Sequence, residues 1–175
     1  DVHGSRGLGD VYKRQKVALD LNIDKKIIQK ALPLLSFEGR FQYLNKGKIK
    51  NKLNRNELIM IDGAHATADA QNLASYLKKI KIPKYGIWAM TKNKDPDLFI
   101  KQLKGIFKKI ITIPIENEIS SVSAQELYKV ATENKFNVEK SDNFAQALKK
   151  ISSKEKKLIV CFGSLYNCGN ILNKN

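Results

Sequence analysis

Continuous apolar runs alternate with helix-like segments along most of the chain, and this alternation constrains the fold more than any other feature. The runs are Leu58–Ile61, Tyr85–Met90, Lys109–Ile115 and Leu158–Phe162. Apolar runs of this length are typical of strands buried on both faces, and helices between successive strands make the connections parallel. The sequence therefore predicts an α/β domain with a mainly parallel, Rossmann-like sheet and helices on both faces.

The other elements follow from apolar spacing, caps and helix breakers. Ser123 and Glu126 form a capping-box pattern, and Pro33 ends the helix before it. The Lys/Asn-rich stretch Asn45–Asn56 predicts a hairpin or loop. We expect short strands at Phe41–Leu44 and Phe136–Val138, and helices over Lys16–Leu21, Asp24–Leu32, Thr67–Ile80, Asp97–Phe107, Ser123 to about Asn134, Asn143–Ile151 and Tyr166–Leu172.

Size and composition narrow the class of protein. The chain has 175 residues, of which 42% are hydrophobic and 28% charged, as in a globular protein with one main domain. No apolar run reaches the ~18–20 residues of a membrane-spanning helix, so no membrane partner is expected. The two cysteines, Cys161 and Cys168, exclude a disulfide scaffold and a four-cysteine zinc site. We expect both thiols to be buried, reduced and not nucleophilic, in a cytoplasmic protein.

The net charge of +15 raises the question of a nucleic-acid partner. The lysines are spread along the chain, and they accompany Ile and Asn, the other residues of AT-rich codons. The short sequence signatures of nucleic-acid-binding proteins are also absent. The sequence therefore argues against nucleic acid as the main partner.

The first residues match a translated laboratory sequence. Ser5–Gln15 reads SRGLGDVYKRQ, which a transposase sequencing adaptor encodes when read in frame. We therefore expect residues 1–15 to be an artefact that makes no packed contacts with the domain, and the native protein to extend upstream of Lys16. Gly7 and Gly9 are then not a phosphate-binding loop.

Polar residues follow three of the expected strands, at Asp62–Thr67, Thr91–Asp95 and Gly163–Tyr166. In a parallel sheet the carboxyl ends of strands open on one edge, where ligands bind. Asp62 there can accept a bond from a ribose hydroxyl or hold a magnesium-bound water, and His65 can donate to a phosphate. The alternative is that Asp62 caps the following helix and His65 only packs.

The other candidates also have two interpretations each. Ser164 lies before a helix, where it can help to bind an anion or simply cap that helix. Lys94 and Asp95 lie in the loop after Tyr85–Met90, as ligand contacts or as a solvated ion pair. Arg40 can reach a phosphate on a neighbouring domain, or lie on the surface.

The order of four motifs along the chain favours the functional interpretations of these residues. Gly39-Arg40-Phe41-Gln42, Ile61-Asp62-Gly63-Ala64-His65, the Lys94-Asp95 loop and Gly163-Ser164-Leu165-Tyr166-Asn167-Cys168-Gly169 follow one another along the chain. Together they resemble the C-terminal domain of folylpolyglutamate synthase/dihydrofolate synthase, in the Mur ligase superfamily. The chain departs from that family at Ala66-Thr67, where Asn-Pro is usual.

The resemblance implies a domain organisation. Residues 16–36 correspond to the helical end of an upstream ATP-binding domain, 37–45 to the linker and first strand, and 46–175 to the C-terminal domain. It also implies an ATP-dependent amide (C–N) ligase that adds L-glutamate to folate or dihydropteroate through an acyl phosphate, acting as a monomer.

The resemblance also assigns roles to the candidate residues. Arg40 and Asp62 contact ATP, with Lys94 and Asp95 beside them, and the catalytic candidates His65 and Ser164 face the phosphate and glutamate. The ligands of Mg²⁺ and the phosphate loop belong to the upstream domain, and no G-x-x-x-x-G-K-[ST] occurs in this chain. We therefore expect this chain alone to be inactive and to bind ATP weakly.

Two other interpretations stay open at this stage. One is the C-terminal domain of a peptidoglycan-type Mur ligase, which acts on a different substrate. The other is a basic binding module without catalysis.

Overall fold

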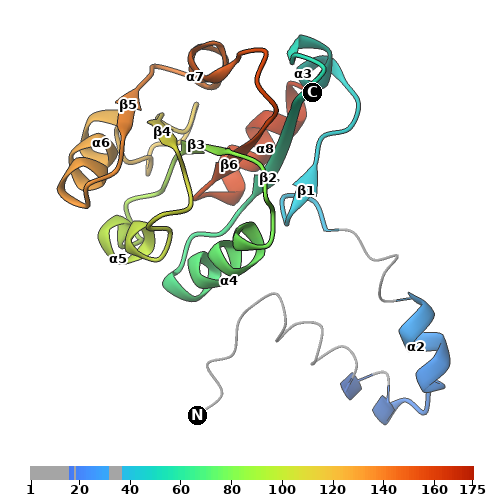
Figure 1. Cartoon of the computed structure of the whole chain (residues 1–175). Coiled ribbons are helices and arrows are strands. Elements are labelled where there is room, and N and C mark those ends of the chain that lie inside the picture. Colours follow the sequence, from blue (N-terminus) through green and yellow to red (C-terminus); the bar gives the residue numbers. More distant parts are fainter. Residues whose placement is uncertain (1–15, 18, 32–36) are drawn as a thin grey trace.

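The computed structural model describes residues 16–17, 19–31 and 37–175. Six strands form one sheet in the order β1-β2-β6-β3-β4-β5, as Figure 1 shows. All neighbours are parallel except β1 and β2, so the predicted mainly parallel α/β fold is confirmed. The strands are β1 (Gln42–Tyr43), β2 (Glu57–Asp62), β3 (Lys84–Trp88), β4 (Lys109–Thr112), β5 (Val138–Lys140) and β6 (Lys157–Phe162).

Helices cover both faces of this sheet. Helices α4, α5 and α6 pack on one face, and α3, α7 and α8 on the other (Figure 1). Each face buries its own apolar cluster, because the helices lie between parallel strands and must cross the sheet on one side or the other. The helices are α2 (Lys25–Ala31), α3 (Lys48–Lys52), α4 (Thr67–Lys78), α5 (Pro96–Lys101), α6 (Ala124–Glu133), α7 (Phe144–Ile151) and α8 (Leu165–Asn173).

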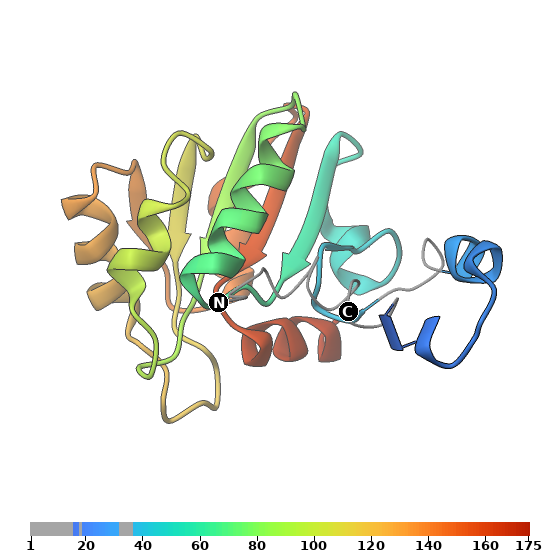
Figure 2. The ribbon, with the colours of Figure 1, turned by 90° about the horizontal axis from the view of Figure 1, so that it is seen from below.

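The central strand β6 explains why the strands read as continuous apolar runs. Leu158, Val160 and Phe162 point into the α4–α6 face, and Ile159 and Cys161 into the α7–α8 face. All five are fully buried, since side chains alternate across a sheet that is covered on both sides. The parallel strands also end on one edge, and Figure 2 shows α8 lying across it beneath the arrowheads.

One predicted element is wrong. The sequence predicts a hairpin or loop over Asn45–Asn56, but the structure has the short helix α3 within it. Ile49 is its one buried residue, so no amphipathic period marks it. The N–H groups of Lys48 and Ile49 donate to the backbone and side-chain oxygens of Asn175 at 2.7 and 3.1 Å. A distant contact therefore supports this helix, which local sequence patterns do not reveal.

Several boundaries also shift. The strands expected at Tyr85–Met90 and Lys109–Ile115 end earlier, at Trp88 and Thr112. The expected strand Phe136–Val138 begins later, as β5, because α6 ends through Lys135 at a φ of +63° and the Phe136 N–H donates to Ala131. Helix α5 stops well before Phe107, in a series of turns that leads through Gly105 at a φ of +74°. Positive φ is costly for most residues and interrupts a helix.

The segment before the sheet is described in part. Helix α2 follows Asp24, whose carboxylate accepts the Lys26 N–H at 2.6 Å. Residues 1–15, which carry the adaptor prediction, lie outside the described residues, as do 18 and 32–36. Among the helices of the described ranges, none has the length and apolar character needed to cross a bilayer.

Candidate functional site

Three sequence-predicted motifs meet at one corner of the carboxyl edge. The Gly63 N–H, in the turn after β2, donates to the Gly39 carbonyl of the linker at 2.7 Å. Both glycines face the start of α8. A Cβ at Gly63 would lie 2.2 Å from Leu165 Cδ2, and one at Gly39 would lie 3.2 Å from Cys168 Cβ. The absence of side chains at both positions lets the three segments pack together.

Asp62 holds the linker and the turn together. Its side chain is buried, with 1% of the residue exposed. Oδ2 accepts the Phe41 N–H and Oδ1 accepts the Ala64 N–H, each at 2.8 Å. Asp62 therefore does not cap α4; Asp69 does so by accepting the Ala66 N–H at 3.3 Å.

The charge on Asp62 is opposed by its burial. Desolvation raises the pKa of this carboxyl above its usual value, and the two backbone hydrogen bonds and the Arg40 guanidinium offset only part of that rise. Because the Arg40 charge lowers the pKa of Asp62, the guanidinium lies near this carboxylate. Arg40 is half-buried beside this buried carboxylate, so its guanidinium is partly accessible and can bind a phosphate.

An aromatic brace supports the linker. Phe41 adopts a φ of +44°, an uncommon conformation for a bulky residue. Its ring packs on Tyr76 of α4 with 4.7 Å between centroids, and the Tyr76 hydroxyl donates to the Tyr43 hydroxyl at 3.3 Å. This packing and the bond to Asp62 hold the linker in a strained form, which sets where Arg40 emerges.

His65 lies in the same turn. Its Nδ1 lies 2.8 Å from the Gly63 carbonyl and 4.0 Å from Asp69 Oδ2. A carbonyl can only accept, so Nδ1 carries a proton in this arrangement. Ala66 is the N-cap residue of α4, and Thr67 is its first helical residue.

Ser164 lies two residues beyond Phe162, the residue of β6 that pairs with Asp62. Its hydroxyl accepts the Asn167 N–H at 3.4 Å and caps α8. Gly163 before it has a φ of +105°, and a Cβ there would lie 2.2 Å from the Ala89 carbonyl. The capping interpretation of Ser164 is therefore confirmed; its catalytic role stays a prediction.

Lys94 and Asp95 lie apart from this corner, in the connection from β3 to α5. Asp95 caps α5 by accepting the Leu98 N–H at 2.9 Å. The Lys94 N–H donates to the Thr91 carbonyl at 3.3 Å. No contact within the described residues joins either side chain to Arg40 or Asp62, so their place beside a nucleotide stays a prediction.

Two further features bear on ligand binding. Among the described residues, no group of three or more His, Cys, Asp or Glu side chains is placed to hold a metal ion.

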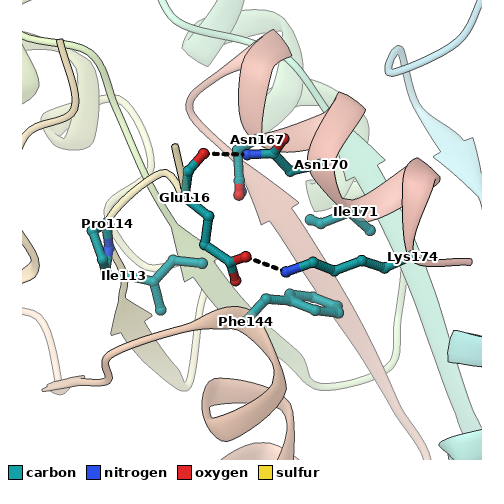
Figure 3. Close-up of a pocket in the computed structure, with 8 residues that line it drawn as sticks. All are labelled: Ile113, Pro114, Glu116, Phe144, Asn167, Asn170, Ile171 and Lys174. Carbon is teal, nitrogen blue, oxygen red and sulfur yellow. Dashed lines mark hydrogen bonds and ion pairs between the residues drawn. The ribbon is translucent and has the colours of Figure 1, made fainter. Parts of the chain in front are cut away.

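A narrow pocket lies between α8 and the segment that follows β4. There Glu116 accepts a hydrogen bond from Asn170 through its backbone carbonyl and pairs with Lys174 through its carboxylate (Figure 3). This slot has no room for a water molecule, so it is a packing seam of α8.

Both thiols are expected to be unreactive in the folded chain. Cys168 lies under the linker corner, where burial raises its pKa to about 12, and burial raises the pKa of Cys161 well above the usual value. Only the thiolate is nucleophilic. We expect a chromogenic disulfide reagent to label neither thiol in buffer and both in urea. Fast labelling of native protein would contradict this burial.

Comparisons with known proteins assign the chain to a family. The family model described as the dihydrofolate synthetase C-terminal domain matches residues 45–174. The chain belongs to this family. A search of curated proteins found no match. The match begins at the last residue of the segment 37–45 and covers β2 to β6, including Asp62 and the turn that follows it, but not β1.

Solved structures of similar fold include proteins from three bacteria. E. coli FolC in complex with ADP matches with a TM-score of 0.69 and 19% identity over 86% of this chain and 34% of that one. A bifunctional folylpolyglutamate synthase/dihydrofolate synthase from Yersinia pestis, with AMPPNP and Mn, matches with a TM-score of 0.70 and 18% identity, over 86% of this chain and 34% of that one. Folylpolyglutamate synthase from Mycobacterium tuberculosis, with ADP and AMPPCP, matches with a TM-score of 0.71 and 18% identity, over 86% of this chain and 35% of that one. The chain thus spans about a third of the length of these relatives.

Proposed function

We propose that this chain is the C-terminal part of an ATP-dependent ligase that adds L-glutamate to folate or dihydropteroate. The observation that carries the proposal is the corner where the linker, the turn after β2 and the start of α8 meet, in a dihydrofolate synthetase C-terminal domain. Solved proteins of this fold are described with ADP, with DHPP, or with Mn, AMPPNP and L-glutamate.

The residues of the corner fit one end of a nucleotide. In the proposal, Arg40 neutralises phosphate charge from the linker, and Asp62 fixes the direction in which Arg40 emerges. His65 and Ser164 face the phosphate and glutamate, while Lys94 and Asp95 contact the nucleotide from the loop after β3. ATP would supply a phosphoryl group to the substrate carboxylate, with release of ADP, to give an acyl phosphate. The glutamate amine would then attack the acyl carbon, forming the amide bond and releasing inorganic phosphate.

The described residues fit the metal less well. Mg²⁺ prefers several oxygen ligands in octahedral geometry, and none of the acidic side chains described here forms such a group. We therefore place the Mg²⁺ ligands and the phosphate loop in the rest of the enzyme. For the same reason we expect the printed chain alone to bind ATP weakly and to show no ligase activity.

The proposal is tested with the intact protein that contains this domain. Release of ADP and phosphate is measured with folate or dihydropteroate, with and without L-glutamate. We expect release to require all substrates and to yield a glutamylated product, with a kcat/KM at least ~10-fold lower for Arg40→Ala. Activity with a UDP-linked sugar peptide, or none with any carboxylate, would reject the proposal in favour of the two alternatives above.

A further inference from the structure

The edge of the sheet opposite the candidate site is strongly basic. We call it the amino edge, because the parallel strands begin there. Eight lysine and arginine residues lie in its connections against one acid, Glu155. The carboxyl-edge connections (63–66, 89–95, 113–123, 141–143 and 163–164) hold two basic residues and four acidic ones. In sheet order, the amino-edge segments are 53–56, 152–156, 79–83, 102–108 and 134–137.

Backbone hydrogen bonds join these connections into one row. The bonds are Lys157 N–H to Asn56 O at 3.3 Å, Leu158 N–H to Pro83 O at 2.9 Å, Lys108 N–H to Lys84 O at 2.9 Å and Ile110 N–H to Asn137 O at 2.9 Å. With strands about 4.8 Å apart, five strands place the row along about 19 Å. Lysines that are far apart in the sequence therefore lie side by side, which removes one reason for discounting a nucleic-acid partner.

Neither helix dipoles nor composition accounts for this row. Lysines in the last turn of a helix are favoured by its dipole, as Lys78 of α4 and Lys101 of α5 are. Lys81, Lys108 and Lys156 lie in the connections, beyond that turn. AT-rich codons explain how many lysines the chain has but not their gathering on one edge.

The row is also largely uncompensated. None of the eight basic residues, all of them described, lies within 4.0 Å of a carboxylate; Lys109, at the start of β4, pairs with Glu139 at 2.6 Å. Burial, and then the nearby charge of Lys81, lowers the pKa of Lys84. Such repulsion costs free energy in the free protein and is relieved when an anion binds.

A groove opens at the β4–β5 end of the row, with a volume of about 360 Å³. Lys104 and Lys135 line it together with the half-buried rings of Phe107 and Phe136. Gly105 lines it as well, and a side chain there would meet no atom within 4 Å. Cations beside aromatic rings are the usual means of holding the phosphate and the base of an unpaired nucleotide.

We propose that the amino edge binds single-stranded nucleic acid, with its phosphates along the lysine row and one base in the groove. An anionic membrane fits this surface poorly, because only Leu58, the second residue of β2, lies near it among the large exposed apolar side chains of the described residues. An acidic peptide would match the charge but not the aromatic groove. The proposal concerns the opposite edge from the ligase site and does not depend on it.

The test is binding of the chain to a fluorescein-labelled oligothymidylate of about 12 nucleotides, within the range of site sizes for strand-binding proteins. The edge variant is Lys81→Gln/Lys104→Gln/Lys135→Gln. Its control, Lys26→Gln/Lys92→Gln/Lys129→Gln, removes the same charge from exposed positions elsewhere. Circular dichroism confirms that both variants are folded.

We expect the edge variant to bind at least about 10-fold more weakly and the control within about twofold of the wild type. The slope of log K against log salt should fall by about 2 in the edge variant, since three contacts to a single strand are lost. Equal weakening of both variants would overturn the proposal, as would equal affinity for an abasic strand of the same length. Tighter binding to polyglutamate or to phosphatidylserine vesicles would overturn it in favour of those partners.

Discussion

The variant Glu57→Ala should lose about 3–5 kcal/mol of unfolding free energy, because it breaks a buried ion pair at the amino end of the sheet. Glu57 is fully buried at the start of β2, and Lys157 is 1% exposed at the start of β6. Their charged atoms, Glu57 Oε1 and Lys157 Nζ, lie 3.9 Å apart. Removing the carboxylate leaves a buried ammonium without its counter-charge.

Other donors also depend on Glu57. Its carboxylate accepts the Ser153 N–H at 2.7 Å, the Asn54 N–H at 2.9 Å and the Ser152 hydroxyl at 2.9 Å. These bonds tie the connection before β2 to the connection before β6, so the variant leaves several donors unsatisfied as well. Urea unfolding measures the loss.

The matched control is Glu155→Ala, which changes an exposed glutamate in the connection before β6. It should change the free energy of unfolding by no more than about 0.5 kcal/mol. A loss below about 1 kcal/mol for Glu57→Ala would mean that water replaces the pair, and would contradict the buried network.

The pH dependence of this contribution has a definite sign. Desolvation raises the pKa of Glu57, but its hydrogen bonds with Ser153, Asn54 and Ser152 outweigh desolvation and lower the pKa below its usual value. The stabilisation is therefore present above the unfolded pKa of about 4.3 and is lost as the pH falls through the lower folded pKa. The wild type should lose more stability than Glu57→Ala on acidification below about pH 5.

The sheet could be predicted from the sequence because its signal is local. A strand buried on both faces, such as Leu158–Phe162, needs apolar residues at every position, and five successive ones are visible without any partner. The carboxyl-end rule then brings Asp62 and Ser164 to one edge, as the structure does. Burial and topology are therefore readable from the pattern of residues.

What the sequence could not show depends on distant partners. Helix α3 is supported by Asn175, more than 120 residues away. Lys157 and Glu57 read as exposed strand ends, because a charged residue at the start of a strand gives no sign that its counter-charge begins the neighbouring strand. Phe41 lies within a motif that we singled out, yet its packing on Tyr76 needs the folded linker.

The residue where this distinction matters most is Asp62. The sequence predicts a nucleotide contact or a helix cap, whereas the carboxylate accepts one bond from the linker and one from the turn. In the intact protein that contains this domain, we expect Asp62→Ala to lower the kcat/KM of the proposed ligase reaction by about 10–100-fold, or about 1.4–2.7 kcal/mol. It should also lose about 2 kcal/mol of stability, because two backbone N–H groups lose their acceptor.

A control separates activity from stability. Glu126→Ala removes the capping-box carboxylate of α6, which accepts the Ser123 N–H at 3.0 Å and lies outside the linker corner. We expect it to lower the melting temperature without changing kcat/KM per folded molecule. If Asp62→Ala behaves in the same way, Asp62 has a structural role only and its functional assignment is rejected.

If Asp62→Ala does lower activity, a double-mutant cycle with Arg40→Ala distinguishes its two possible roles. A carboxylate that acts only by fixing the linker has no further effect once the arginine is gone, so the double variant should match Arg40→Ala. A carboxylate that touches the nucleotide itself loses its own contact in either background, so the two losses add. The bond to Phe41, the residue that follows Arg40, favours the first result, in which the losses in kcat/KM are far from additive. Fully additive losses would instead make Asp62 a direct ligand of the nucleotide.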